Sequence, residues 1–153
     1  MNILALDLAT RTGWAHSCGE SGVQDFTARR GESPGMRWLA LRAWLNRVLD
    51  MAPTDLIAYE QAHHRGGAAT HCAHAMIGVV ESVAAERHIE ITNRHTGTIK
   101  KFAVGKGNAD KKAVCDAAEA RWSNVIDDNH ADALWLLELV KCELGGCVYA
   151  NRL

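Results

Sequence analysis

The chain has 153 residues, 48% of them apolar, so it is long enough for a single domain over residues 1–153 with a hydrophobic core and short for two. Its formal net charge of -1 excludes a uniformly charged surface for nucleic acid or membranes. Five cysteines without a C-x-x-C pair, no signal peptide and no apolar run of about 18 residues predict a soluble, cytoplasmic protein.

The first third of the chain predicts three strands and a helix. The strands are expected at 2–8 (NILALDL), 12–17 (TGWAHS) and 22–29 (GVQDFTAR), with a turn region between Gly19 and Gly22. Three consecutive strands at this spacing favour an antiparallel meander. Residues 36–50 follow with an apolar face at helical spacing, and Pro53 ends this helix. The residues of that face are Trp38, Leu41, Leu45 and Val48.

The rest of the chain alternates strands and helices. A strand at 55–60 (DLIAYE) precedes a helix from about 71 to 87, and a strand at 89–93 (IEITN) follows it. Two short helices between 96 and 123 are joined by the glycine-broken VGKGNAD, and a final helix spans 128–144. Strands separated by helices need parallel crossovers. We therefore predict an α/β fold: a mixed five-stranded sheet, antiparallel meander plus parallel strands, with helices on both faces.

Two otherwise apolar strands carry a carboxylate near their ends. Asp7 lies near the end of the first strand and Glu60 at the end of the fourth, and these strands are expected to be neighbours. The last helix adds Asp128 and Asp132, four residues apart, with Asn129 three residues before Asp132. Converging oxygen ligands suit Mg²⁺ or Mn²⁺, and two such ions about 3.5–4 Å apart can hydrolyse a phosphodiester. Taken one at a time, these residues could instead be solvated strand ends or a helix cap.

Positive charge is concentrated between residues 94 and 112, a segment that carries +5 while the rest of the chain carries -6. A basic strip beside an acidic metal site suits a nuclease, because the strip can hold backbone phosphates while the metals hydrolyse one of them. A solvated helix surface is the alternative. The predicted DNA contacts in this strip are Arg94, Lys100, Lys101, Lys106, Lys111 and Lys112.

Four stretches occur in order along nearly the whole chain: LALDLATRTGWA at 4–15, LIAYEQ at 56–61, IKKFAVGKGNADKKAV at 99–114 and NHADALWLL at 129–137. Together they resemble the RuvC-type Holliday-junction resolvases of the ribonuclease H-like superfamily, especially the compact phage-encoded members. The resemblance implies a homodimeric, magnesium-dependent endonuclease that nicks two strands symmetrically across a four-way DNA junction in a bacterial or phage-infected cell. We expect the apolar stripe from Ala73 to Ala84 to form the dimer interface.

The resemblance also implies roles for individual residues. Asp7, Glu60 and Asp132 correspond to metal-binding acids of the family. Lys100 and Lys111 correspond to residues that contact the backbone or the reacting phosphate. The predicted cofactors are two Mg²⁺ or Mn²⁺ ions per active site.

The chain departs from the family pattern at two places. The family has an acid or a histidine three residues before the last aspartate, where Asn129 stands here beside Asp128. Either Asp128 or position 129 could supply the fourth ligand, and a weakened or inactive junction-binding protein is the alternative function. Where bacterial members place an aromatic after the catalytic glutamate, this chain has His63, and we expect His63, His64 and Arg65 to contact the DNA.

Two other classes of protein fit less well. His71 and His74 are one helical turn apart near Cys72, but Cys72 points off their face and no familiar structural-zinc spacing occurs. Actin-like kinases also begin with an aspartate and glycine motif like LDLATRTG, yet they need two such domains to enclose a nucleotide. The sequence therefore favours the nuclease.

Overall fold

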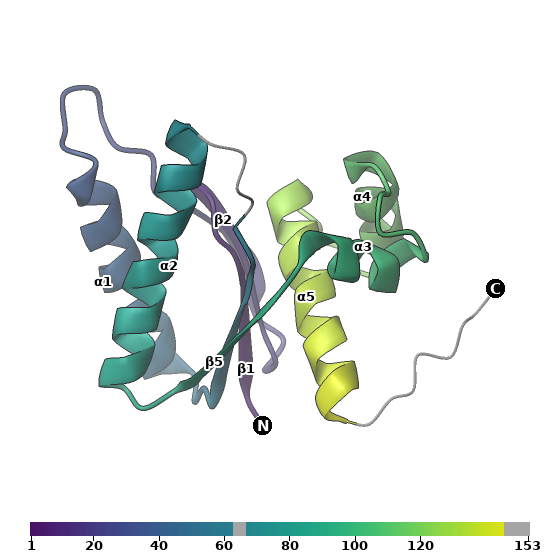
Figure 1. The fold of residues 1–153 in the computed structure, drawn as a ribbon. Coiled ribbons are helices and arrows are strands. Elements are labelled where there is room, and N and C mark those ends of the chain that lie inside the picture. Colours follow the sequence, from purple (N-terminus) through teal and green to yellow (C-terminus); the bar gives the residue numbers. More distant parts are fainter. Residues whose placement is uncertain (63–66, 146–153) are drawn as a thin grey trace.

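The structure is a computed structural model that describes residues 1–62 and 67–145. The predicted order of strands and helices is confirmed (Figure 1). The elements are β1 (Ile3–Asp7), β2 (Arg11–His16), β3 (Ser21–Asp25), α1 (Gly35–Met51), β4 (Leu56–Glu60), α2 (Ala68–Glu86), β5 (Glu90–Arg94), α3 (Thr96–Val104), α4 (Lys111–Glu119) and α5 (Asp128–Leu144). Within the described residues, no helix is long and apolar enough to cross a membrane.

The strands form one mixed sheet in the order β3-β2-β1-β4-β5. The β1–β2 and β2–β3 pairs are antiparallel, whereas β1–β4 and β4–β5 are parallel. Helices α1 and α2 cover one face of the sheet, and α3, α4 and α5 lie on the other (Figure 1). The predicted α/β fold class, with helices on both faces, is therefore confirmed.

Strand periodicity decides which face each acid meets. In β1, Leu4 and Leu6 pack on the α1 and α2 side, whereas Ile3 and Ala5 pack on the α5 side. Because successive side chains alternate between faces, the side chain of Asp7 lies on the same face as those of Ile3 and Ala5, toward α5. The same alternation in β4 places Glu60 there as well, after Leu56 and Ala58. Burial of each core leucine contributes about 1.5–3 kcal/mol to folding, which fixes this register.

The third strand is shorter than predicted. It ends at Asp25 rather than at residue 29. One carboxylate oxygen of Asp25 accepts hydrogen bonds from the backbone N–H of Thr27 at 2.7 Å and from its hydroxyl at 2.6 Å. Such a local side-chain bond forms a turn in place of the next ladder bond.

The apolar face of α2 packs against the sheet and is not left exposed for a second copy. Val80 and Ala84, which were expected at a dimer interface, are buried in the core between α2 and the sheet, together with Met76 and Val83. Ala73 and Ile77 remain only partly buried. The stripe from Ala73 to Ala84 is therefore largely core, because the sheet needs an apolar cover on this face.

Candidate active site

Three carboxylates from separate elements line one pocket of about 550 Å³. Asp7 ends β1 and Glu60 ends β4, and these parallel neighbours finish at the same edge of the sheet. Asp132 lies in the second turn of α5, which packs across β1 and β2. The structure thus brings together three of the four acids that the sequence singled out, and Asn129 lines the same pocket.

Two of the acids of this pocket, Asp7 and Asp132, have raised pKa values. Burial raises the pKa of Asp7 well above its usual range, and the negative charges of Glu60, Asp132 and Asp128 raise it further. Burial, followed by the charges of Glu60 and Asp128, raises the pKa of Asp132 to about 7. These carboxylates therefore resist being ionised together unless positive charge is added among them.

A divalent cation fits the chemistry of these donors. Carboxylate oxygens are hard ligands that suit Mg²⁺ or Mn²⁺, and a cation would offset the repulsion that raises both pKa values. As they stand, no three Asp, Glu, His or Cys side chains of the described residues are close enough to form a ready-made metal cluster. The acids border the pocket from different elements instead.

The raised pKa of Asp132 predicts a pH-dependent stability in the presence of a chelator. The unfolded carboxyl group loses its proton near pH 4, but the folded one keeps it to about pH 7. The folded state binds more protons over that window, so the free energy of unfolding falls as pH rises from about 4 to about 7.

Chemical denaturation of wild type and Asp132→Asn across this window measures the contribution of Asp132, including its effect on the pKa of Asp7. Burial lowers the pKa of His16 and of His130, and both histidines titrate in both proteins, so the difference between the curves removes them. We expect Asp132→Asn to gain stability over wild type as pH rises. The same change at Asp116, an exposed carboxylate of α4, should add no such slope. Parallel curves for wild type and Asp132→Asn would contradict the prediction.

The first turn of α5 is fixed against β2. A Cβ built on Gly13 would lie 1.9 Å from the backbone oxygen of Asn129, so only glycine permits this approach. The side-chain amide of Asn129 donates to the carbonyl of Arg11 at 2.7 Å. Asp127 caps the helix by accepting from the backbone N–H of His130 at 2.9 Å, and it accepts from the Arg11 guanidinium at 3.1 Å. These contacts position the carboxylate that follows on the next turn.

Asp128 is engaged by a lysine rather than directed to the pocket. The ammonium group of Lys111 donates a hydrogen bond to a carboxylate oxygen of Asp128. This bond lowers the pKa of Asp128 and raises the pKa of Lys111. Lys111 lines the pocket, whereas Asp128 is not among the described residues that line it.

The VGKGNAD segment positions two lysines. Gly105 ends α3 with a φ of 78°, a backbone conformation that glycine adopts easily. The Lys100 ammonium donates to the carbonyl of Ala109 at 2.7 Å, and Asp110 caps α4. The segment therefore folds back on α3 and places both Lys100 and Lys111 at the pocket.

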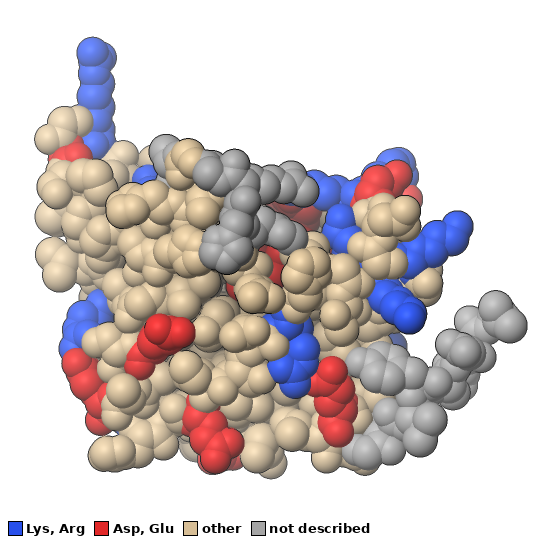
Figure 2. All heavy atoms as spheres, viewed as in Figure 1, with Lys and Arg blue, Asp and Glu red and all other residues tan. Residues whose placement is uncertain are grey.

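Other predicted DNA contacts lie away from the pocket. Arg94 forms an ion pair with Glu143 at 2.6 Å, and Lys112 forms one with Asp116 at 2.6 Å. Lys and Arg side chains gather over α3 and α4 at the right of Figure 2, with acidic side chains among them. In the part of the chain that the structure describes, four predicted contacts do not line the pocket: Arg94, Lys101, Lys106 and Lys112. Three others lie outside the described residues: His63, His64 and Arg65.

Thr96 and Gly13 are two of the positions at the site that are absent from the sequence-based prediction. The Thr96 hydroxyl donates a hydrogen bond to a carboxylate oxygen of Glu60. The parallel register pairs Glu60 with Arg94, so residues just after Arg94 emerge at the acidic edge. The register between β4 and β5 therefore indicates that Thr96, two residues after Arg94, lies at the site. For Gly13 the signal is a glycine inside a strand, which often marks a close backbone approach.

Comparisons with known proteins show the fold. No protein-family model matches, and no curated protein matches the sequence. Thermus thermophilus RuvC superposes with a TM-score of 0.74 and 18% identity over 95% of this chain and 97% of that chain. T. thermophilus RuvC in complex with a Holliday junction substrate gives a TM-score of 0.78 and 17% identity over 96% and 97%. The yeast mitochondrial Holliday junction resolvase Ydc2 gives 0.58 and 13% over 95% and 84%. The ribonuclease H-like, RuvC-type fold is therefore confirmed.

Proposed function

We propose that this protein is a structure-selective DNA endonuclease that resolves four-way junctions and other branched DNA by metal-dependent phosphodiester hydrolysis. One observation carries the proposal: Asp7, Glu60 and Asp132 reach a single pocket from three elements, and lysines border it. The fold adds support, because a solved structure with this fold is a RuvC bound to a Holliday junction substrate.

Six residues of the pocket have a chemical role in this proposal. Asp7, Glu60 and Asp132 would hold two Mg²⁺ or Mn²⁺ ions through carboxylate oxygens. Bound divalent ions supply an activated water and stabilise the leaving oxygen of a phosphodiester. Lys100 and Lys111 donate hydrogen bonds to phosphate oxygens and so orient the DNA backbone. The Thr96 hydroxyl holds the Glu60 carboxylate in place.

Symmetric nicking of a four-way junction needs two active sites, so we propose a homodimer. Since Val80 and Ala84 are buried within one copy, these two residues of the expected stripe do not contribute to the interface. A cytoplasmic location stays a prediction.

The test is nicking of a labelled four-way junction with Mg²⁺, with Mn²⁺ and with EDTA, beside a linear duplex of the same sequence. We expect paired nicks in the junction that depend on the metal. Binding without nicking would support the alternative, a junction-binding protein without catalysis. Neither binding nor nicking would refute both.

The positions of Lys100 and Lys111 predict an effect on the salt dependence of junction binding. Each contact between a lysine and a phosphate releases about one counterion, so Lys100→Ala or Lys111→Ala should reduce the slope of log Kd against log salt by about one unit. Fluorescence anisotropy with EDTA measures this slope. Arg42→Ala is the control, because Arg42 pairs with Glu86 on the opposite side of the sheet. Unchanged slopes for both lysine variants would place them away from the DNA.

Asn129 offers a test of the fourth ligand. We expect Asn129→Asp to raise the nicking rate, because an added carboxylate strengthens a two-magnesium site. The same change removes the bond to the Arg11 carbonyl, so the free energy of unfolding should fall by about 1 kcal/mol.

Asp128→Asn is the companion variant for nicking assays across magnesium concentrations. If only this variant loses activity, Asp128 contributes to catalysis, either as the fourth ligand or by positioning Lys111. If neither change alters nicking, the site functions with Asp7, Glu60 and Asp132 alone.

A further inference from the structure

His95 joins β5 to α3 at the edge of the acidic pocket. The parallel register pairs Glu60 at the end of β4 with Arg94 at the end of β5, so the next residue emerges where the acids gather. Thr96, one residue further along, bonds to the Glu60 carboxylate. His95 is exposed and lines the same pocket as the acids and the two lysines. It therefore borders whatever this pocket binds.

The imidazole ring of His95 is held in place by the helix that it begins. His95 is the N-cap of α3, and its Nδ1 accepts a hydrogen bond from the backbone N–H of Gly97 at 3.1 Å. Serine, threonine, aspartate and asparagine are the residues usually preferred at an N-cap. Because Nδ1 is the acceptor, the proton of the neutral ring is on Nε2. The ring thus offers one N–H donor that the cap does not use.

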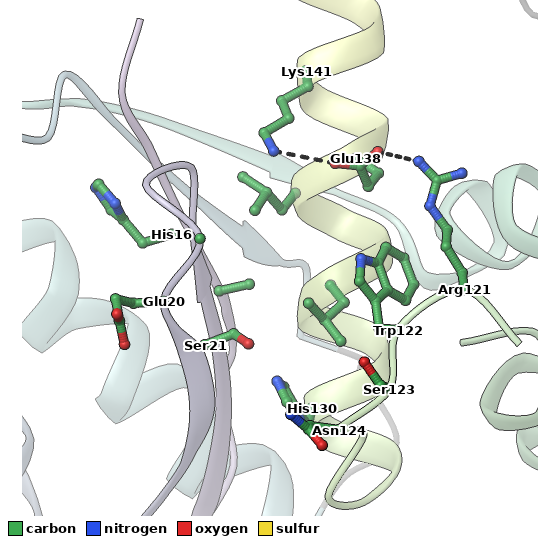
Figure 3. A pocket seen from close by; sticks show the side chains of 14 residues that line it. His16, Glu20, Ser21, Arg121, Trp122, Ser123, Asn124, His130, Glu138 and Lys141 are labelled. Carbon is green, nitrogen blue, oxygen red and sulfur yellow. Dashed lines mark hydrogen bonds and ion pairs between the residues drawn. The ribbon is translucent and has the colours of Figure 1, made fainter. Parts of the chain in front are cut away.

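His130 makes the same kind of hydrogen bond in a buried position. Its Nδ1 accepts from the backbone N–H of Ile126 at 3.2 Å, in the wall of a second pocket of about 340 Å³ (Figure 3). The residue is only 3% exposed, so its ring serves the packing of the first turn of α5. Of these two rings, that of His95 is the one that a ligand can reach.

The turn that carries His95 lies directly against the segment that positions the lysines. A Cβ built on Gly107 would lie 3.0 Å from the backbone oxygen of Gly97, so the two stretches of backbone are in close contact. Asn108 and Lys111 follow Gly107 and line the pocket together with His95. The imidazole and the lysine therefore border one pocket, as contacts to a single DNA strand require.

A neutral donor suits a phosphate at this position. Asp7, Glu60 and Asp132 are negative when ionised, and a divalent cation has to meet that charge. A lysine or arginine beside Glu60 would pair with the carboxylate and compete with the cation. An imidazole N–H forms no such ion pair, yet its hydrogen bond to a charged phosphate oxygen is stronger than one between neutral groups.

We propose that His95 binds the DNA substrate by donating its Nε2–H to an oxygen of a backbone phosphate in the strand that enters the acidic pocket. This inference rests on the proposed function, because it takes the pocket as the place where the DNA strand lies. The ring then has two uses, since Nδ1 caps α3 and Nε2–H holds the phosphate. The first turn of α3 also carries the bond from Thr96 to Glu60. Substrate contact and support of a metal-binding acid thus share one turn of helix.

The variant His95→Asn separates the two uses of the ring. Asparagine caps helices well, so this variant should keep the midpoint of chemical denaturation, whereas His95→Ala should lower it. The asparagine amide is shorter than the imidazole and ends before the position of Nε2. We therefore expect His95→Asn to weaken binding of a four-way junction in EDTA by about tenfold. Unchanged binding by His95→Asn would reduce His95 to a helix cap and overturn the inference.

His88→Asn is the matched control for these measurements. His88 is also exposed, and it precedes β5 at the end of the sheet opposite to the acids. Its φ of 55° is a conformation that asparagine adopts readily, so the fold should be kept. Junction binding by His88→Asn should equal that of wild type. An equal loss in both asparagine variants would overturn the assignment to position 95.

Modified junctions locate the contact on the DNA. Each carries a single methylphosphonate, in which a methyl group replaces a charged phosphate oxygen, at one of the successive positions next to the branch point. At the phosphate that His95 contacts, the modification should weaken binding by wild type about tenfold more than binding by His95→Asn. Binding is measured in EDTA, so the result does not depend on nicking.

The outcomes distinguish this inference from the proposed function. Non-additive effects at one phosphate would support the contact. Additive effects at every position, with junction binding intact, would overturn the role of His95 and leave the proposed function standing. Absence of junction binding by wild type would refute both.

Discussion

Asp7→Asn should abolish nicking of the four-way junction while junction binding is retained or becomes tighter. The substitution removes a carboxylate that would hold the divalent ions, yet it leaves the lysines of the pocket in place. Loss of a residue that hydrogen-bonds to a metal ligand lowers metal affinity or activity by up to about a hundredfold. Loss of the ligand itself should lower the nicking rate by at least as much. Junction nicking and junction binding by the same preparation measure the two effects.

A stability measurement separates this result from misfolding. Burial and the neighbouring acids raise the pKa of Asp7, so the metal-free protein loses stability as pH rises above the pKa of the unfolded carboxyl group. Asp7→Asn should therefore be more stable than wild type in EDTA at pH 7 although it is inactive. Asp50→Asn is the control for both measurements, because Asp50 is exposed and pairs with Arg87 away from the site. Near-normal nicking by Asp7→Asn would refute the site assignment.

Gly13→Ala should impair both folding and nicking. The new Cβ would lie 1.9 Å from the backbone oxygen of Asn129, so the first turn of α5 must move away from β2. Overpacking of this kind costs about 1–3 kcal/mol of the free energy of unfolding. Displacement of Asp132 by about 1 Å should lower the nicking rate by about a hundredfold.

Gly22→Ala provides the matched control in the neighbouring strand. A Cβ on Gly22 would meet the Trp14 indole nitrogen at 3.4 Å, which is ordinary contact. Chemical denaturation and nicking assays on both variants should therefore show a loss for Gly13→Ala and little change for Gly22→Ala. Equal behaviour of the two would mean that the approach of α5 to β2 does not position the site.

The sequence by itself determined the order of the elements, the mixed sheet and the three acids of the pocket. Periods of two and 3.6 residues are local properties, so they mark strands and helices without knowledge of their partners. Parallel crossovers then make β1 and β4 neighbours, and Asp7 and Glu60 meet because both strands end at one edge. Asp132 follows from the motif on the last helix.

Only the tertiary structure decided how the side chains around those acids are used. Asn129 bonds to the Arg11 carbonyl and Asp128 to Lys111, over separations of 118 and 17 residues. These hydrogen-bond partners depend on how the helices pack on the sheet, and a local sequence pattern does not specify that packing. The same packing buries Val80 and His130. The physical reason is that hydrogen bonds and burial depend on distances between elements, whereas the sequence pattern specifies each element separately.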